Sequence, residues 1–355
     1  GEQRVAAYFL CANRGKRSVA IDIASPQGIA QVQQLAAEAD VLIENYKVGQ
    51  LAKYGLDAVS LRALNPRLIY CSITGYGQQG PLAHKAGYDF AIQAEAGLMS
   101  ITGEKGGEPQ KVGVAVTDIM TGVYATTAIL AALHERHSTG RGRHIDASLF
   151  DVQVAMLANL GANYLVAGQH DGKAPGRAGN AHANIVPYQV FEVAPADDGS
   201  KDHLILAVGN DSQYIKFCKV AGRPDLSTDP RFATNANRVR HRAELVPLFE
   251  AVLKSRRKAD WLNALEAEKV PCGAINNLAE VFADPHIRSR EMVTHWEHPA
   301  RGTLELTSSP MKLSATPVRT DFPPPLLGQH TDEVLRELLQ LDTNSLDVMR
   351  KQRII

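Results

Sequence analysis

Asp118 is the residue of this sequence whose position most favours covalent chemistry. It precedes a stretch in which apolar side chains recur at helical spacing, namely Ile119, Val123, Thr127 (through its methyl), Leu130 and Leu133. Arg136 and His137 fall near the end of that stretch and Gly140 follows it, as the C-terminus of a helix favours. We therefore expect Asp118 at the N-cap or in the first turn of a long helix.

A carboxylate at the start of a helix has a distinctive electrostatic setting. It meets free backbone N–H groups and the positive end of the helix dipole, which hold it ionised at neutral pH. An ionised carboxylate can act as a nucleophile. Capping alone is the commoner reason for an aspartate at such a position, so the nucleophile hypothesis needs support from the rest of the chain.

The composition limits the classes of protein to which the chain can belong. Its 355 residues suffice for two domains, or for one large domain with an insertion. Charged residues make up 21% with a formal net charge of zero, which argues against nucleic-acid and membrane-surface partners. No uninterrupted apolar run approaches a membrane span. A hydrophobic content of 45% with only 6% aromatic residues fits a helix-rich α/β protein.

The cysteines indicate a reducing compartment. The four of them, Cys11, Cys71, Cys218 and Cys272, lie far apart without a CxxC pair. We therefore expect free thiols, no zinc or other metal, and a cytoplasmic protein, with the mitochondrial matrix as the other compartment compatible with them. The chain opens at Gly1 without methionine or leader, and we expect a further segment upstream.

The first part of the chain alternates predicted strands with predicted helices. The strands are 16–23, 41–45 and 68–73, and the helices are 26–39, opened by a proline, and 57–64. Such repeats form parallel βαβ units with right-handed crossovers, so we expect an α/β fold with a doubly wound, Rossmann-like sheet. Ligands bind at the carboxyl ends of such strands, here 21–24, 44–47 and 74–80.

A glycine motif raises a competing hypothesis. Gly75, Gly77 and Gly80 match GxGxxG after a strand, the pattern of a dinucleotide-binding oxidoreductase. That fold needs a helix to begin at the third glycine, whereas Pro81 and polar residues follow here. A glycine-rich turn is the better interpretation.

The chain changes in character beyond the central helix. A strand near Ile145 and an apolar helix to about Val166 complete a large domain over 1–167, and a linker follows over 168–185. A hairpin and helices with scattered Arg and Lys predict a small, inserted α+β domain over 186–290. The remainder, 291–355, is expected to return to the large domain through a strand within 303–313, a Pro-rich arm over 317–327 and a helix over 331–340.

Nine segments in order carry a family resemblance. They are NRGKRSVAIDI (13–23), DVLIENYKVGQLAKYGLD (40–57), NPRLIYCSITGYGQQGP (65–81), AGYDF (86–90), TDIMTGVYA (117–125), TGRGRHIDASLFD (139–151), GNAHANIVPYQVF (179–191), VPCGAINN (270–277) and PPPLLGQHTDEVL (323–335). Over nearly its whole length the chain resembles the class III CoA-transferases, the CaiB/BaiF or formyl-CoA and carnitine CoA-transferase type. The resemblance implies an interlocked homodimer, and it leaves the family's first strand and loop, which also touch CoA, outside this chain.

The resemblance implies a chemistry for Asp118. In the family an aspartate attacks an acyl-CoA thioester to give a mixed anhydride, CoA thiolate returns to form an aspartyl-CoA thioester, and an acceptor acid then receives the CoA. Covalent catalysis of this kind divides one exchange into easier steps. Each step passes through an oxyanion, which needs N–H donors and a site poor in water.

The resemblance also assigns binding residues. Those expected to contact CoA are Ile21, Asp22, Ile23, Ala24, Asn45, Tyr46, Lys47, Lys53, Lys85, Ala86, Gly87 and Tyr88. Lys53 stands where the family often has Arg, and both Lys53 and Lys85 could equally be solvated surface lysines. Gly179, Asn180 and His182 fall on the family's glycine-rich lid, with fewer glycines than the formyl-CoA type. His182 either touches the substrate carboxylate or has no role, and Asp89 is either a family acidic residue or a helix cap.

Two other functions compete with the transferase. Racemases of the same fold carry Gly-His-Asp where this chain has Gly87-Tyr88-Asp89, and tyrosine, with a pKa near 10, is a poor base at neutral pH. A non-catalytic CoA-binding protein would not need Asp118. Within the transferases the pattern looks most like the succinyl-CoA:dicarboxylate branch, so we expect succinyl-CoA as donor and a carboxylic or dicarboxylic acid as acceptor.

Overall fold

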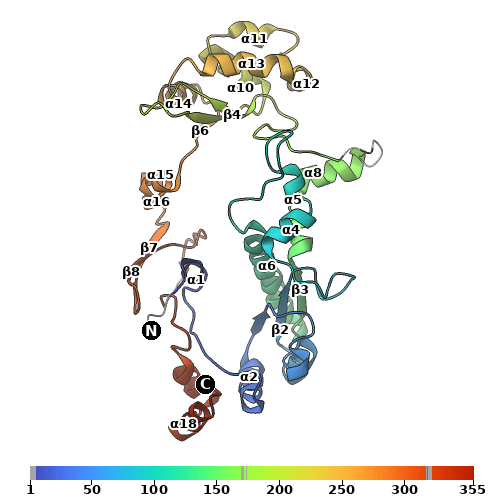
Figure 1. The fold of residues 1–355 in the computed structure, drawn as a ribbon, viewed down its shortest axis with the longest axis vertical. Coiled ribbons are helices and arrows are strands. Elements are labelled where there is room, and N and C mark those ends of the chain that lie inside the picture. Colours follow the sequence, from blue (N-terminus) through green and yellow to red (C-terminus); the bar gives the residue numbers. More distant parts are fainter. Residues whose placement is uncertain (1–4, 169–171, 173, 317, 319–321) are drawn as a thin grey trace. The chain divides into compact units, whose positions relative to one another are not determined.

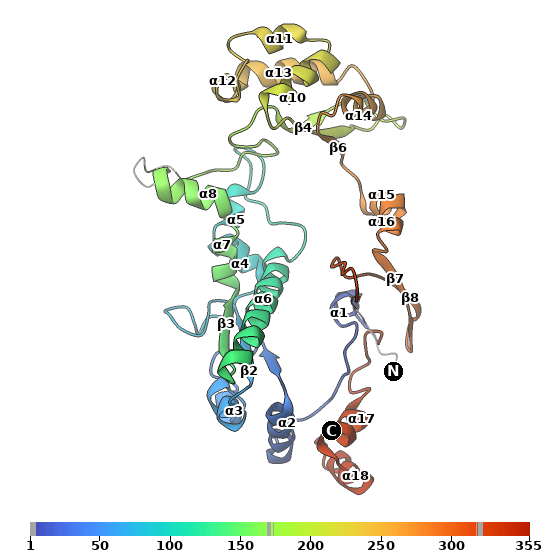
Figure 2. The same ribbon diagram turned by 180° about the vertical axis from the view of Figure 1, so that it is seen from behind.

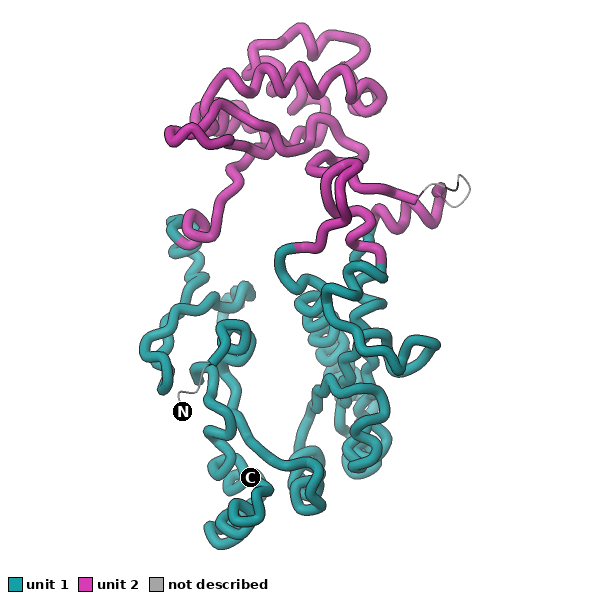
Figure 3. Tube along the Cα trace, in the orientation of Figure 1, with its two compact units in different colours: residues 1–96, 113–158, 283–355 teal, residues 97–112, 159–282 magenta. Residues whose placement is uncertain are grey.

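The computed structural model describes residues 5–168, 172, 174–316, 318 and 322–355. The chain forms two compact units, which Figure 3 distinguishes by colour. Unit 1 comprises residues 1–96, 113–158 and 283–355, and unit 2 comprises residues 97–112 and 159–282. The described residues of the predicted linker 168–185 and most of the predicted small domain lie in unit 2, whereas residues 169–171 and 173 of that linker are outside the described residues. Residues 97–112, which the sequence placed in the large domain, also belong to it.

Unit 1 is built on a parallel three-stranded sheet, as predicted. Its strands are β1 (Val41–Glu44), β2 (Ile69–Thr74) and β3 (His144–Ser148), in the order β1-β2-β3. The register aligns Leu42 with Tyr70 and Tyr70 with His144. The chain between β1 and β2 contains α3 (Ala58–Leu64), and that between β2 and β3 contains α4 (Asp89–Glu95) and α6 (Val116–Thr139).

Helices cover both faces of this sheet (Figures 1 and 2). Tyr70 packs with Leu61 of α3 and Ala36 of α2 (Pro26–Glu38). The next residues along β2 alternate to the other face, where Ile69 and Cys71 pack against α6. Side chains of successive strand residues point to opposite faces, so one buried strand builds two cores. This is the doubly wound arrangement expected from the sequence.

Most of the apolar residues that predicted helix α6 (Val116–Thr139) do not lie on its buried face. Ile119, Val123 and Leu130, part of the apolar stripe seen in the sequence, are 55%, 52% and 60% exposed. The buried face carries mostly small side chains instead: Thr117, Thr121, Ala125, Ile129 and Ala132. Small residues let the helix axis approach the sheet closely, so size rather than hydrophobicity selects the packed face. α6 is long and apolar enough to cross a membrane by length and composition. Core helices of soluble proteins meet the same two criteria.

Residues 16–23 do not form the predicted strand. The segment is extended, but its backbone bonds to the C-terminal part of unit 1 rather than to a strand. That part holds a hairpin of β7 (Val293–His298) and β8 (Gly302–Thr307), then α17 (Thr331–Leu339) and α18 (Thr343–Lys351). α17 was predicted, whereas β7 and α18 were not. Residues 317 and 319–321 of the predicted Pro-rich arm lie outside the described residues.

The apolar helix predicted to run to about Val166 is interrupted. It consists of α7 (Leu149–Ala155), α8 (Ala158–Asn163) and a π-helical turn, η2 (Tyr164–Gly168). Ala158 adopts a φ of 46°, a left-handed conformation that a continuous α-helix cannot contain. The break coincides with the boundary between the units at residues 158 and 159.

Unit 2 contains the predicted hairpin. Strands β4 (Tyr188–Glu192) and β5 (His203–Ala207) pair antiparallel, and β6 (Cys272–Ala274) adds to β5. The helices that complete this part of the fold are α5 (Leu98–Ile101), α10 (Asp211–Val220), α11 (Pro224–Thr228), α12 (Asn235–Arg240), α13 (Arg242–Leu253) and α14 (Lys258–Ala267). Phe191, Phe217, Phe249 and Trp261 form its buried centre. Short elements α1 (Ala7–Ala12), α15 (Leu278–Ala283) and α16 (Pro285–Ser289) complete the described chain.

The contact between Gly142 and Leu68, the residue before β2, gives a test of the unit 1 core. A Cβ at Gly142 would lie 2.0 Å from the carbonyl oxygen of Leu68, so we expect Gly142→Ala to lower the free energy of unfolding by about 2–4 kcal/mol. Urea unfolding followed by circular dichroism measures this. Gly122→Ala is the control: open space surrounds Gly122 inside α6, and alanine there should stabilise by about 0.5–1 kcal/mol. Equal midpoints for the two variants would contradict the packing described.

Candidate active site

Asp118 lies in the first turn of α6 but does not cap it. The N-cap residue is Ala115, whose side chain offers no acceptor. Instead the carboxylate of Asp89, the first residue of α4, accepts hydrogen bonds at Oδ1 from the N–H groups of Thr117 (2.8 Å) and Asp118 (3.3 Å). Asp89 therefore supplies from another helix the acceptor that the start of α6 needs.

Buried polar side chains support this arrangement. Gln93 donates its amide to Oδ2 of Asp89 (2.6 Å), and the hydroxyl of Thr117 donates to Oε1 of Gln153 (2.6 Å). Gln93, Gln153 and Thr117 have no solvent exposure. The Nε2 of Gln153 has no hydrogen-bond partner among the described residues. The first turn of α6 is thus fixed by side chains on two other helices.

The electrostatics of Asp118 differ from the prediction. Asp118 is exposed, but partial desolvation of its carboxylate by the surrounding chain and the neighbouring negative charge of Asp89 raise its pKa above the ordinary aspartate value. The sequence argument expected the helix N-terminus to favour the charge of Asp118. Asp89 takes that role, and its own charge opposes ionisation of Asp118. A carboxylate whose charge is less stabilised by its surroundings is the better nucleophile once ionised.

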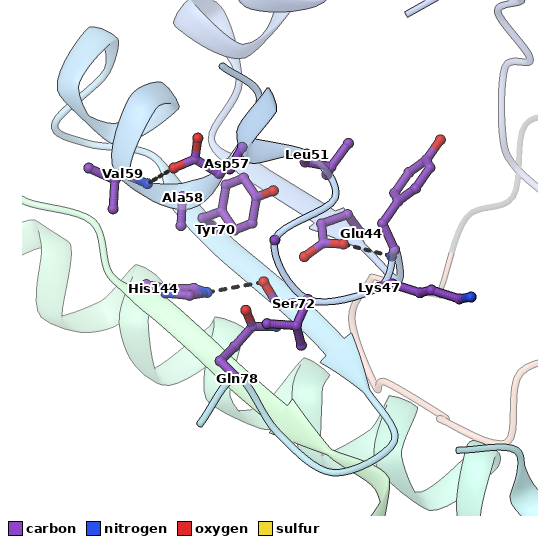
Figure 4. A pocket seen from close by; sticks show the side chains of 14 residues that line it. Glu44, Lys47, Leu51, Asp57, Ala58, Val59, Tyr70, Ser72, Gln78 and His144 are labelled. Atoms are coloured by element: carbon purple, nitrogen blue, oxygen red, sulfur yellow. Dashed lines mark hydrogen bonds between the residues drawn. The ribbon is translucent and has the colours of Figure 1, made fainter. Parts of the chain in front are cut away.

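The predicted CoA residues after β1 border a pocket of 270 Å³ (Figure 4). Tyr46 and Lys47 line it, together with Glu44, Val48, Gly49, Leu51, Ala52, Asp57, Ala58, Val59, Tyr70, Ser72, Gln78 and His144. Asn45 and Lys53 are exposed beside it without belonging to its lining. Lys53 lies in the short η1 helix (Ala52–Tyr54), with its Nζ 4.5 Å from the ring centre of Tyr54. The loop after β1 therefore brings two of these four predicted residues, Tyr46 and Lys47, to the lining of one pocket.

The polar floor of this pocket was not predicted. Ser72 Oγ and His144 Nε2 are 3.0 Å apart, and burial lowers the pKa of His144, which favours the neutral imidazole. Glu44 accepts a hydrogen bond from the N–H of Tyr46 (2.7 Å). Ser72 follows Tyr70 by two residues, and Tyr70 pairs with His144 in the sheet. Strand alternation places Ser72 and Tyr70 on the same face of β2, and the register of β2 with β3 brings His144 beside them. The sequence does not reveal that register, so it could not predict this group.

The glycine-rich turn after β2 does not open a helix. Gly77 and Gly80 have φ values of 89° and 95°, and the chain stays irregular until α4 begins at Asp89. Gly75 and Gly87 touch: a Cβ on Gly75 would lie 2.6 Å from the Cα of Gly87. The turn is therefore a closed loop whose ends meet at two glycines. The alternative of a dinucleotide fingerprint, which requires a helix at the third glycine, was rightly set aside.

Lys85 is not a free surface lysine in this loop. Its Nζ lies 2.6 Å from Oε1 of Glu95, whose Oε2 accepts a hydrogen bond from the hydroxyl of Tyr76 (2.8 Å). Ala86 and Tyr88 beside it are exposed, Tyr88 by 81%. Glu95, which the sequence reading missed, neutralises the charge of Lys85.

The remaining predicted residues belong to two other segments. Ile21–Ala24 is part of unit 1, where the N–H of Ala24 donates to the side chain of Asp22 (2.9 Å). Gly179, Asn180 and His182 are part of unit 2. His182 Nδ1 accepts a hydrogen bond from the N–H of Asn184 (3.0 Å), and its backbone carbonyl accepts one from Arg242 (2.6 Å). The acceptor at Nδ1 leaves Nε2 of the neutral ring as an N–H donor.

The fold is thus α/β with a parallel sheet, and Asp118, the residue predicted to be the nucleophile, lies in the first turn of α6. The family model of CoA-transferase family III matches residues 1–331. The chain belongs to this family, and it is a class III CoA-transferase, as the sequence resemblance predicted.

Individual relatives agree with this assignment. The chain is 48% identical over 338 residues to the succinate–glutarate CoA-transferase of Agrobacterium fabrum, across 95% of this chain and 82% of the relative. It is 40% identical over 339 residues to the succinyl-CoA:glutarate CoA-transferase of Homo sapiens, across 96% of this chain and 75% of the relative. The crystal structure of a CaiB/BaiF family protein from Brucella suis matches with a TM-score of 0.81 at 46% identity, over 95% of this chain and 85% of that one.

The pKa of Asp118 yields a pH prediction. Asp89→Asn keeps an oxygen that accepts from Thr117 but removes the negative charge, so the pKa of Asp118 should fall. Activity that needs the ionised Asp118 is lost as pH falls through this pKa. The acid limb of kcat/KM against pH should therefore move to lower pH. Asp151→Asn, a carboxylate of α7, is the charge-matched control. An unmoved acid limb in Asp89→Asn would show that another group controls it.

Proposed function

We propose that this CoA-transferase moves CoA from succinyl-CoA to a carboxylic or dicarboxylic acid, with Asp118 as the nucleophile. The observation that carries the proposal is that the Asp118 carboxylate has no hydrogen-bond or ion-pair partner among the described residues. It accepts no hydrogen bond from any described residue, because Asp89 holds the nearby N–H groups of α6. A carboxylate that neither caps the helix nor pairs with a cation is free to attack. The glutarate-specific names of the relatives support a dicarboxylic acid as acceptor.

The first half of the reaction removes the donor acid. An oxygen of Asp118 attacks the thioester carbonyl carbon, the C–S bond breaks, and CoA leaves as the thiolate with an aspartyl–acyl anhydride remaining. The thiolate then attacks the carbonyl carbon of Asp118, the anhydride C–O bond breaks, and the donor carboxylate leaves. An aspartyl-CoA thioester results.

The second half reverses these steps with the acceptor. An acceptor carboxylate oxygen attacks the aspartyl thioester and expels the thiolate, which attacks the acceptor's acyl carbon to form the new acyl-CoA. Asp118 returns as a carboxylate. No proton enters or leaves, so the cycle needs no general base. It does need exclusion of water, which would hydrolyse the anhydride, and we assign this to the lid residues Gly179, Asn180 and His182.

The residues proposed to contact CoA fall into three groups: those that meet the nucleotide, those that border the pocket, and the lysines that could bind a phosphate. Ile21–Ala24 and Asn45 present backbone and amide groups to the nucleotide, and Tyr46 and Lys47 border the pocket after β1. Lys53 is available to a phosphate. Lys85, next to Ala86, Gly87 and Tyr88, must exchange Glu95 for a phosphate to serve the same purpose. The four free cysteines suit a reducing compartment, so we place the enzyme in the cytoplasm or the mitochondrial matrix.

Intact-protein mass spectrometry tests the covalent mechanism. After addition of succinyl-CoA without acceptor, the native chain should gain a mass equal to CoA or to the succinyl group. Hydroxylamine should release it, and peptide mapping should place it on Asp118. Asp118→Ala should show no adduct, and its turnover should fall by at least about 10³-fold because the nucleophile is lost.

Asp151→Asn, which alters a carboxylate of α7, is the matched control and should form the adduct like the native chain. An adduct that persists in Asp118→Ala would assign the nucleophile to another residue. A native chain that binds CoA and forms no adduct would favour a racemase or a binding protein.

We further propose that the enzyme is an interlocked homodimer. The chain exposes 21490 Å², whereas two separate globular units of these sizes would expose about 17,000 Å² in total. An excess of this size is comparable with the area that obligate dimers bury. The uncharged exposed residues Ile119, Val123 and Leu130 of α6 are part of that surface.

Sedimentation measures the assembly. The mass should be twice the 38.5 kDa of the chain and should persist on dilution to nanomolar concentration. Mixed tagged and untagged protein should form hybrids only after unfolding, because linked rings cannot separate while folded. A monomer, or rapid exchange between folded dimers, would contradict this proposal.

A further inference from the structure

The segment 182–186, which begins with His182 of the proposed lid, is bonded to side chains of α12 and α13 in unit 2. Arg242, the first residue of α13, donates through Nη2 to the carbonyl oxygens of His182 (2.6 Å) and Ala183 (3.1 Å). A planar guanidinium that meets two successive carbonyl groups fixes the direction of the backbone between them. The chain that follows Asn180 therefore has a set path.

Asn235 and Arg238 continue this contact along the same segment. Nδ2 of Asn235 donates to the carbonyl of Asn184 (2.9 Å), and its Oδ1 accepts from the N–H of Val186 (3.2 Å). Arg238 donates through Nε to the carbonyl of Val186 (2.7 Å). With Arg242, the three side chains lie three and four positions apart, the spacing of residues on one side of a helix. Together they bind backbone groups of four of the five residues in the segment.

Two of these three side chains are themselves held by the core of unit 2. Arg238 has no solvent exposure, forms an ion pair with Asp211 (2.7 Å) and has its guanidinium carbon 4.1 Å from the ring centre of Tyr214. The carboxylate of Asp211, the first residue of α10, also accepts from the N–H of Asn235 (3.0 Å). The segment is thus bonded to a rigid part of the unit.

The position of Arg242 does not favour the helix to which it belongs. It opens α13, where the positive end of the helix dipole repels a cation. The side chain is partly buried, and this burial lowers the pKa of the guanidinium because it disfavours the charged form. The carbonyl oxygens of His182 and Ala183 offset this cost by accepting charge-assisted hydrogen bonds. The contact with the lid segment, rather than the stability of α13, therefore accounts for an arginine at this position.

We propose that Arg242 and Asn235 are positioning residues that anchor the lid through the segment 182–186. The anchored segment determines where Gly179 and Asn180 lie when the lid covers the anhydride and the aspartyl-CoA thioester. Their contribution to the reaction is the exclusion of water. This inference rests on the proposed function, because it concerns the lid assigned there.

Hydrolysis is the side reaction that an anchored lid suppresses. Water attacks the carbonyl carbon of the aspartyl-CoA thioester, the C–S bond breaks, and Asp118 returns as a carboxylate. The two protons of the water pass to the CoA thiol and to the solvent. Transfer to an acceptor acid instead conserves the thioester. Over many turnovers, the ratio of free CoA to new acyl-CoA therefore measures how often water enters the site.

The test is this ratio in Arg242→Met, with succinyl-CoA as donor, glutarate as acceptor and chromatography of the products. Methionine keeps an unbranched side chain and removes both hydrogen bonds to the segment. We expect the ratio of hydrolysis to transfer to rise about 5–30-fold, the effect of leaving carbonyl groups without their donor. Asn235→Ala, which removes the contact with Asn184 and Val186, should raise the ratio in the same direction. A loss of folded protein alone would lower both reactions in proportion and leave the ratio unchanged.

Arg240→Met is the matched control. Arg240 is an exposed arginine at the end of α12, and it donates to the side chain of Asn237 in its own helix (3.4 Å). The substitution removes the same charge close to Arg242 in the sequence. The ratio of hydrolysis to transfer should stay within about 2-fold of the native value.

An unchanged ratio in either Arg242→Met or Asn235→Ala would overturn the proposal, as would an equal rise in Arg240→Met. Mass spectrometry of the native chain with succinyl-CoA distinguishes this failure from failure of the proposed function. If Asp118 forms its adduct while the ratio stays unchanged in the variants, only the anchoring inference fails. If no adduct forms in the native chain, the transferase mechanism fails.

Discussion

The backbone N–H groups that open α6 need acceptors, and Asp89 provides the acceptor from another helix. This single interaction fixes the first turn of α6. Because Asp89 accepts from the free N–H groups there, the carboxylate of Asp118 does not cap the helix. It also sets a negative charge beside Asp118, which contributes to raising the pKa of that carboxyl group. A conventional N-cap in place of Ala115 would leave these amides satisfied locally and would remove the reason for Asp89 to lie there.

Residues 18–22 and the C-terminal part of unit 1 also supply hydrogen-bond partners to each other over a long distance in the sequence. Residues 18–22 are not part of the sheet β1-β2-β3. Their N–H groups still require acceptors, which come from His330, Thr331 and Ile354. A segment near the start of the chain therefore keeps its extended shape only when the last helices are folded.

Glycines make close approaches possible where the site needs them. The turn after β2 closes because Gly75 and Gly87 allow two backbones to touch, and α4 with Asp89 begins directly after that contact. A side chain at either position would push α4 away from β2 and shift Asp89 relative to α6. The glycine pattern that suggests a nucleotide loop thus helps to place Asp89, which accepts hydrogen bonds from the first N–H groups of α6.

The sequence by itself determined the α/β class, the parallel sheet, the start of α6 near Asp118 and its end at Gly140. Alternation, helical periodicity and terminal residues are local signals, so they can be read without knowing neighbours. Only the tertiary structure decided which face of α6 is buried, that residues 16–23 meet helices rather than a strand, and that Glu95 pairs with Lys85. Each of these outcomes depends on which partner lies across a contact. Thr331 is 311 residues from Ala20, and no local pattern contains that information.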